Sequence, residues 1–226
     1  MRKVGRRMDF TTFTVSSVVR YLQKWWLNLR ASLALLIKRD DLAVDLYRTI
    51  LRIDPNDEFA HAVLGNLYAK RGDRTAAINE FEQLVARHPK NADGWFNLGF
   101  IYDQSDDLAD AERCFRMALE LNPALDRACY GLGLVLIRQN RLDEAIVALK
   151  RNIKLQHFSP YGYYQLGMTY HHLGRSAEAW QMYEKLSQFE PKYAATLKRD
   201  LEQTVPQAVG GLKPSQSTQE TRAEAV

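Results

Sequence analysis

The sequence predicts an all-α fold made of about five stacked helical hairpins and one closing helix. Three observations support this prediction: a residue pattern that recurs every 34 positions, apolar residues at helical spacing, and turn-forming residues at a fixed place in the pattern. A repeat of this length is one supersecondary unit that cannot bury its apolar face alone. The hairpins are therefore expected to stack on one another.

The composition is that of a globular protein, and its charge is unevenly distributed. The 226 residues are 46% hydrophobic and 26% charged, with a net charge of +4. Residues 1–39 contain nine Lys or Arg against Asp9 alone, which gives +8, and subtracting this from +4 leaves −4 for the remainder. The basic pI of about 9.0 therefore describes an N-terminal segment rather than a basic domain, and it does not favour nucleic acid as the partner.

The cellular location is predicted from cysteine usage and from the N-terminus. Cys114 and Cys129 form no CxxC motif, which favours a reducing compartment. The basic N-terminus is followed by only a short apolar run without a small-residue cleavage site, so a cleaved signal is not expected. No apolar run approaches the ~20 residues of a membrane-spanning helix. We expect a cytoplasmic protein, with peripheral membrane association as an open alternative.

The chain begins with a basic amphipathic segment at 1–23, and a degenerate first repeat follows at 24–57. Apolar residues between positions 10 and 37 recur at helical spacing, which predicts an amphipathic helix. Leu27 and Ala31 hold the places that Trp and Gly take in the later pattern. This first unit is therefore the weakest match to the repeat.

Residues 92–125 show the pattern most completely. They contain W-x2-L-G-x2-Y, A-x3-F and P, formed by Trp95, Leu98, Gly99, Tyr102, Ala111, Phe115 and Pro123. The same register continues without insertion through 58–91, 126–159 and 160–193. This pattern resembles the tetratricopeptide repeat (TPR) family. The resemblance implies a right-handed solenoid of helix-turn-helix repeats whose function is to bind other proteins.

Turns and the C-terminal end are also predicted. Gly72, Asp106, Asn140 and Gly174 occupy one position of the repeat, where a left-handed residue would end the first helix. Residues 194–205 continue in phase and resemble the capping helix of TPR proteins, which a solenoid needs as a polar end. The composition of residues 206–226 predicts a disordered tail.

No arrangement of residues indicates catalysis, a metal site or a cofactor. Only His171 and His172 are neighbours among the histidines, and adjacent helical residues point about 100° apart, which does not suit a metal. Gly131-Leu132-Gly133 lacks the third glycine and the preceding strand of a phosphate loop. We expect Gly133 to serve helix packing and the protein to be non-enzymatic.

The side of each first helix that faces away from the repeat core is the candidate binding surface. If this side only faced water it should be polar, yet it carries many apolar and aromatic residues. In the TPR family it lines the concave groove. The candidate groove residues are Phe59, Asn66, Asp93, Phe96, Asn97, Phe100, Asp103, Arg127, Tyr130, Leu134, Tyr161, Tyr164 and Met168. The alternative is that these side chains complete the core between neighbouring helices.

One specific groove chemistry is disfavoured. Chaperone-binding TPR modules hold a C-terminal carboxylate with Lys, Asn, Asn, Lys and Arg, and the matching places here are Ala62, Asn66, Asn97, Arg127 and Gly131. The first Lys and the last Arg are therefore absent. An apolar or amphipathic helical peptide suits the groove better.

The N-terminal segment has three candidate roles. It could cap the solenoid, occupy the groove of its own or a neighbouring chain, or contact an anionic membrane through Arg20, Lys24, Trp25 and Trp26. The sequence thus predicts a non-enzymatic adaptor or scaffold that binds a partner peptide or helix. The alternative is a membrane-peripheral scaffold that self-associates.

Overall fold

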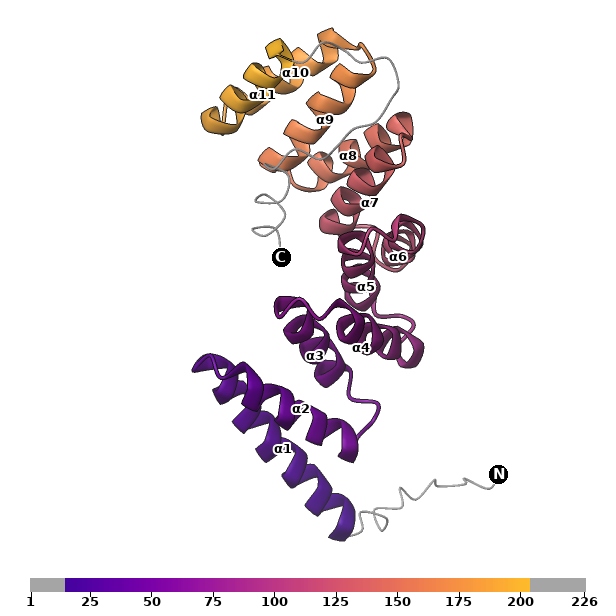
Figure 1. The fold of residues 1–226 in the computed structure, drawn as a ribbon, viewed down its shortest axis with the longest axis vertical. Coiled ribbons are helices and arrows are strands. Elements are labelled where there is room, and N and C mark those ends of the chain that lie inside the picture. Colours follow the sequence, from indigo (N-terminus) through magenta and orange to yellow (C-terminus); the bar gives the residue numbers. More distant parts are fainter. Residues whose placement is uncertain (1–14, 204–226) are drawn as a thin grey trace, which may run out of the picture. The chain divides into compact units, whose positions relative to one another are not determined.

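The computed structural model describes residues 15–203, with side chains from residue 18 onward, and this part is entirely helical with connecting turns (Figure 1). The helices are α1 (Val15–Leu36), α2 (Asp40–Ile53), α3 (Glu58–Lys70), α4 (Arg74–Arg87), α5 (Ala92–Gln104), α6 (Leu108–Leu121), α7 (Asp126–Arg138), α8 (Leu142–Leu155), α9 (Pro160–His172), α10 (Ser176–Ser187) and α11 (Pro191–Gln203). Consecutive helices pair as five hairpins, and α11 follows the last one. The predicted all-α repeat fold is confirmed. The predicted disordered tail, 206–226, lies outside the described residues.

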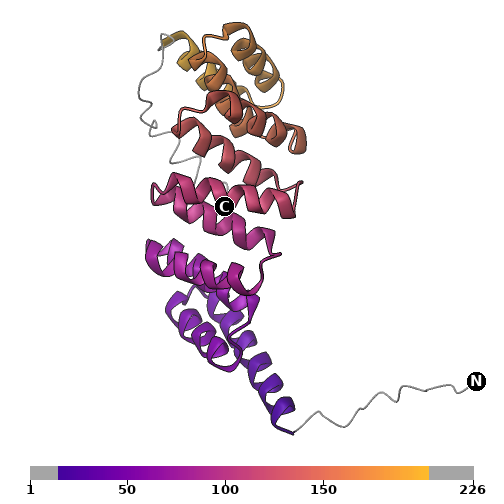
Figure 2. The ribbon, with the colours of Figure 1, turned by 90° about the vertical axis from the view of Figure 1, so that its right-hand side faces the viewer.

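The chain divides into two compact units, Met1–His88 and Pro89–Val226. The N-terminal unit contains α1 to α4, with Tyr47, Leu64 and Phe81 fully buried in its interior. The C-terminal unit contains α5 to α11, whose helices succeed one another as layers (Figure 2).

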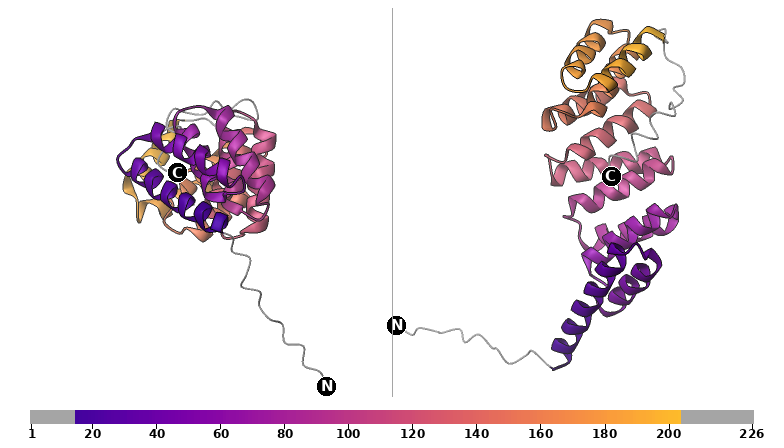
Figure 3. Two further views of the ribbon diagram at one scale, coloured as in Figure 1. Left: turned by 90° about the horizontal axis from the view of Figure 1, so that it is seen from below. Right: turned by 90° about the vertical axis from the view of Figure 1, so that its left-hand side faces the viewer.

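The helix α1 spans the end of the predicted N-terminal segment, 1–23, and the start of the predicted first repeat, 24–57. It is continuous across the predicted boundary between residues 23 and 24, because no Pro or Gly interrupts Val15–Leu36. Leu27, Ala31 and Ala34 are buried, and α1 packs along α2 (Figure 3). The small residues Ala31 and Ala34 allow this close approach.

The C-terminal unit is closed by α11, which packs on α9 and α10. Ala194, Leu197 and Leu201 are its buried residues. The helix begins at Pro191, three residues before the start predicted for a capping helix. Proline is favoured in the first helical turn because its missing N–H would have no intrahelical partner there.

The predicted turn residues have the expected left-handed backbone. The φ angles are +78° at Gly72, +67° at Asp106, +59° at Asn140 and +71° at Gly174. Lys38, at the equivalent place in the first hairpin, has φ +57°. The first hairpin thus uses the same turn even though its sequence gives no Gly, Asn or Asp there.

The structure supports the packing interpretation of Gly131-Leu132-Gly133. A Cβ atom on Gly133 would lie 2.8 Å from the Leu149 side chain, and one on Gly131 would lie 2.6 Å from Cζ of Phe115. The two glycines therefore allow Leu149 of α8 and Phe115 of α6 to pack closely against the backbone of α7. They have no phosphate-loop geometry, because they lie inside α7.

Candidate functional site

A pocket of about 270 Å³ lies in the C-terminal unit, between its first three hairpins. Its lining residues come from α5 to α9 and the α8–α9 turn: Phe96, Phe100, Asp103, Phe115, Asp126, Arg127, Tyr130, Gly131, Leu134, Asn152, Gln156, Ser159, Pro160 and Tyr161. Seven of them were predicted as groove residues: Phe96, Phe100, Asp103, Arg127, Tyr130, Leu134 and Tyr161. The 34-residue repeat brings these positions together because they take equivalent places on α5, α7 and α9.

Three phenylalanines form an aromatic wall of the pocket. Phe96 is only 5% exposed, and its ring centroid lies 6.4 Å from that of Phe100 and 5.9 Å from that of Phe115. Phe100 is half-buried and therefore reachable. Phe96 thus belongs to the core beneath the pocket surface, and Phe100 is the phenylalanine that a ligand would contact. Aromatic contacts of this kind favour rigid placement of the rings.

Arg127 places a positive charge at the edge of this wall. Its Cζ lies 4.6 Å from the ring centroid of Phe96, a cation–π distance. Its Nη2 also lies 3.1 Å from Oδ1 of Asp93, and both side chains are exposed. An exposed pair of this type contributes only about 0–1 kcal/mol, so an incoming carboxylate could replace Asp93 at low cost.

Asp103 lines the pocket, but its charge is used inside the protein. The carboxylate is buried and pairs with Arg138, which also pairs with Asp106 and donates to the Asp103 carbonyl oxygen at 3.1 Å. The interaction joins α5 to the end of α7. A buried carboxylate needs such a partner, so Asp103 supports the pocket rather than offering a free acid to a ligand.

Two tyrosines form the opposite side of the pocket. Burial raises the pKa of Tyr130, although a hydrogen bond from Gln165 acts in the other direction, so its phenol stays protonated at neutral pH. The ring of Tyr161 packs edge-to-face on Tyr193 of α11, with centroids 5.3 Å apart. The capping helix therefore fixes one wall of the site.

Two lining residues on second helices, Phe115 and Asn152, and Gln156 in the turn directly after α8 were not predicted as groove residues. Asn152 is 2% exposed, and its Nδ2 donates to the Asp126 carbonyl oxygen at 3.0 Å. Its Oδ1 has no hydrogen-bond partner within the part of the chain that the structure describes. The pocket floor thus includes one unsatisfied acceptor, an unusual feature for a buried amide.

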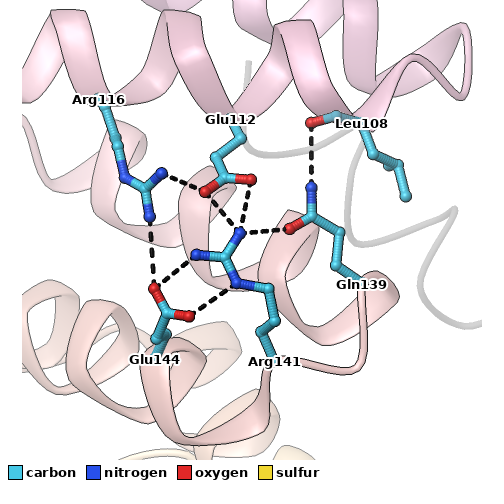
Figure 4. A network of polar contacts seen from close by, with 6 residues as sticks. All are labelled: Leu108, Glu112, Arg116, Gln139, Arg141 and Glu144. Carbon is cyan, nitrogen blue, oxygen red and sulfur yellow. Dashed lines mark hydrogen bonds and ion pairs between the residues drawn. The ribbon is translucent and has the colours of Figure 1, made fainter.

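A charged network braces the two hairpins that supply most of the pocket (Figure 4). Glu112 on α6 pairs with Arg116 and with Arg141, whose Nη1 lies 2.7 Å from Oε1 of Glu112. Arg141 also binds Glu144 at 2.6 Å and Gln139 at 2.8 Å. Burial alone would raise the pKa of Glu112, but the hydrogen bond from Arg141 and the nearby arginine charges hold it below its ordinary value. The carboxylate is therefore ionised at neutral pH and joins α6 to the start of α8.

Four predicted groove residues of the C-terminal unit do not line the pocket. The Tyr164 hydroxyl donates to Oδ2 of Asp200 on α11 at 2.6 Å, and Met168 packs against the core beside α11. These contacts are the ones expected if both side chains complete the core, the alternative left open by the sequence, and their role in partner binding stays a prediction. Asp93 pairs with Arg127, and Asn97 is half-buried. Their part in partner binding stays a prediction.

The other two predicted groove residues, Phe59 and Asn66, belong to the N-terminal unit. Phe59 is 59% exposed and packs edge-to-face on Tyr47, with ring centroids 6.0 Å apart. Asn66 is exposed on the same helix, α3. Both are accessible to a partner, and their role also stays a prediction.

The predicted membrane-contact residues divide into two kinds. Arg20, Trp25 and Trp26 are exposed on α1. Lys24, however, lies 2.6 Å from the carboxylates of both Asp54 and Asp57. Lys24 therefore ties α1 to the loop before α3, and its charge is engaged within the protein.

Other candidate chemistries find little support in residues 15–203. No cluster of three or more His, Cys, Asp or Glu residues in this part is arranged to hold a metal ion. Cys114 and Cys129 are free and buried. At the clamp position Gly131, any side chain would collide with Phe115, so an arginine there is sterically excluded. Within the same residues, no helix is both long and apolar enough to cross a bilayer.

Comparison with curated proteins identifies partial relatives. The chain is 28% identical over 88 residues to the general transcriptional corepressor ssn6 of Schizosaccharomyces pombe, which covers 38% of this chain and 8% of the relative. It is 27% identical over 150 residues to protein O-mannosyl-transferase TMTC3 of Homo sapiens, which covers 63% of this chain and 16% of the relative. The chain therefore spans only a small part of the length of these proteins.

Solved structures and a family model match more completely. A crystal structure of MamA is similar with a TM-score of 0.69 and 26% identity, over 73% of this chain and 96% of that chain. YrrB, described as a TPR protein with an unusual peptide-binding site, has a TM-score of 0.66 and 23% identity, over 75% of this chain and 88% of its own. The family model described as the cilia and flagella-associated protein 70 middle TPR-like domain matches residues 61–190. The chain is therefore a tetratricopeptide repeat protein and belongs to this family of TPR-like domains.

Proposed function

We propose that the protein is a non-enzymatic adaptor whose C-terminal unit binds a partner peptide or helix in the aromatic pocket. TPR proteins are protein–protein interaction scaffolds, and this chain belongs to that class. The proposal that a peptide or helix binds at this place rests on the pocket that equivalent positions of three consecutive hairpins form. Concave, largely apolar sites with a few polar groups are typical binding sites.

The chemistry of the lining supports one class of ligand. Phe100, Tyr130 and Tyr161 are half-buried and suit an aromatic or aliphatic anchor side chain. Arg127 at the edge suits an acidic group near that anchor, because its pair with Asp93 is exposed and exchangeable. The proposed partner is therefore an amphipathic helix or peptide with one large apolar anchor and a neighbouring Asp or Glu.

The human relative is named as a transferase, but this chain spans 16% of its length. The titratable residues that line the pocket are Asp103, Asp126, Arg127, Tyr130 and Tyr161. Asp103 is neutralised by Arg138, and the pKa of Tyr130 is raised. These properties favour binding over catalysis.

A displayed library of amphipathic peptides, selected against the full chain, tests the proposal. Phe100→Ser and Tyr130→Ser should each weaken the selected peptides by about tenfold or more, because removing a central aromatic anchor typically costs about 2 kcal/mol or more. Val147→Ser is the matched control, since Val147 is exposed on α8 and does not line the pocket. Peptides that bind all three variants as tightly as the unsubstituted protein would contradict the assignment of this pocket.

Arg127→Gln tests the acidic component separately. It should weaken peptides with Asp or Glu beside the anchor and leave the same peptides carrying Asn or Gln unchanged. Circular dichroism of each variant checks that helicity is retained. Equal loss for both peptide sets would contradict a charge-specific role for Arg127.

A further inference from the structure

The helix α1 is apolar on two opposite faces. One face carries Leu27, Ala31 and Ala34, which are buried against α2. The other carries Leu22, Trp25, Trp26, Leu29, Leu33 and Leu36, all between 49% and 78% exposed. At about 100° per residue, these six side chains fall within a sector roughly 100° wide that contains no charged residue.

This outer face has the character of a binding surface. Contiguous exposed apolar surface is uncommon on soluble proteins and marks interaction sites. The exposed surface also includes two adjacent tryptophans, 56% and 54% exposed, and tryptophan is the residue most typical of the membrane–water interface. A helix with a wide sector of Trp and Leu suits burial at the boundary between lipid headgroups and acyl chains.

The charge around this face indicates what covers it. Arg20 and Arg30 on α1, with Lys38 and Arg39 directly after it, have no ion-pair partner among residues 15–203. The acidic side chains near the ends of this hairpin are already engaged: Asp40 with Lys70, Asp41 with Arg71, and Asp54 with Lys24. The positive charge of the segment therefore remains uncompensated.

A second copy of the chain would be a poor occupant of this face. Residues 1–39 carry +8, so pairing two α1 helices through their outer faces would bring two such segments together. An anionic bilayer supplies both an apolar layer for the tryptophans and negative headgroups for the basic side chains. No described helix could cross the bilayer, so the contact would lie along its surface.

We propose that the outer face of α1 docks on an anionic membrane surface, with Trp25, Trp26 and Leu29 in the interface and Arg30, Lys38 and Arg39 at the headgroups. The proposal concerns the N-terminal unit and does not depend on the peptide pocket. The sequence analysis predicted Lys24 as a membrane contact, but Lys24 pairs with Asp54 and Asp57. The proposal therefore assigns the headgroup contacts to Arg30, Lys38 and Arg39 instead.

Vesicle sedimentation of the full chain tests this proposal. Vesicles of phosphatidylcholine with about 30 mol% phosphatidylglycerol should bind the protein, and pure phosphatidylcholine vesicles should bind it at least about tenfold more weakly. Trp25→Ser with Trp26→Ser should reduce binding to anionic vesicles by about tenfold or more. Phe158→Ser, an exposed aromatic of the C-terminal unit, is the matched control and should bind normally, as should Phe100→Ser in the pocket.

Salt dependence and a variant without the basic side chains test the proposal even if the tryptophan variant misfolds. Raising the salt from about 0.1 M to about 0.5 M should release the unsubstituted protein, because headgroup attraction is screened. Replacing Arg30, Lys38 and Arg39 by Gln should have a similar effect. Absence of binding to anionic vesicles would overturn the proposal, as would self-association in lipid-free solution that the Trp25→Ser and Trp26→Ser changes abolish, since a second copy would then cover the face.

Discussion

The helices α1 and α11 end the described chain, and their outer faces differ. Both bury three residues against their neighbours: Leu27, Ala31 and Ala34 in α1, and Ala194, Leu197 and Leu201 in α11. The exposed side of α11 carries Lys198, Arg199 and Glu202, whereas that of α1 carries tryptophans and leucines. A stack of repeats needs polar ends to stay monomeric and soluble.

The difference shows that only α11 completes a terminus in the way expected of a cap. The large apolar side chains of α11 face its own unit: Leu197 and Leu201 are buried, and Tyr193 packs on Tyr161. The α1 sequence contains a second apolar set that its own unit does not cover. We attribute this surplus to the proposed membrane contact, and variants of the two helices should separate folding from that function.

The largest effect is expected in α11. Leu197 is fully buried, and its Cδ2 atom would lie 3.0 Å from a Cβ placed on Gly167 of α9. Leu197→Ala should lower the free energy of unfolding of the C-terminal unit by about 2–5 kcal/mol. Hydrogen exchange of the α9–α11 amides measures this loss locally. If protection stays unchanged, α11 is not a structural cap and the comparison fails.

Glu112→Ala should have the next largest effect, of about 2 kcal/mol, because it removes hydrogen bonds between a carboxylate and two arginines. The pKa of Glu112 is lowered in the folded state, so its contribution is complete above the unfolded pKa of about 4.3 and declines as the pH falls through the folded value. Urea denaturation at neutral and acidic pH measures this. A stability difference from the unsubstituted protein that persists at pH ~2 would contradict an electrostatic origin.

Lys24→Met should cost about 1 kcal/mol, since it breaks partly exposed ion pairs and leaves the aliphatic part of the side chain in place. The loss should appear in the hydrogen exchange of α1 and of the first turn of α3, where Asp57 accepts from the Ala60 N–H at 2.7 Å. Arg30→Met serves as the control because Arg30 has no such pair in the described chain. An equal loss of hydrogen-exchange protection in Lys24→Met and Arg30→Met would contradict the view that Lys24 links α1 to this loop.

Leu33→Ser on the outer face of α1 should have the smallest effect, within about 0.5 kcal/mol, because the side chain is already 55% exposed. Thermal or urea unfolding followed by circular dichroism gives the comparison with Leu197→Ala. A large destabilisation at Leu33 would show that the outer face is covered within the protein. The contrast between the two terminal helices would then disappear.

The sequence was sufficient for the fold and for about half of the candidate site. The 34-residue register predicted the hairpins and the left-handed turns at Asp106 and Asn140, because both follow from spacing and local backbone preference. The same spacing identified pocket residues on the first helices, such as Phe100 and Tyr130. Equivalent positions in successive repeats must lie on one side of the stack.

What could not be predicted depends on contacts between hairpins. Phe115 was assigned to the core pattern, yet it also lines the pocket. Gly131 has no side chain, so the Phe115 ring can pack directly against the α7 backbone. Asn152 carries no pattern that would reveal its burial beneath α7 and α9. Tyr164 and Met168 fit the groove spacing, but Tyr164 donates to Asp200 of α11 and Met168 packs against the core cluster of the last repeats.

Gly131 also shapes the pocket that we propose as the peptide site. Its missing side chain admits the Phe115 ring, whose Cζ would lie 2.6 Å from a Cβ atom at position 131. Any larger residue there would push the ring aside and change the shape of the cavity from a position that is itself part of the wall. If an anchor side chain binds in this pocket as proposed, the size that it prefers should change with the residue at position 131, without any change to Arg127.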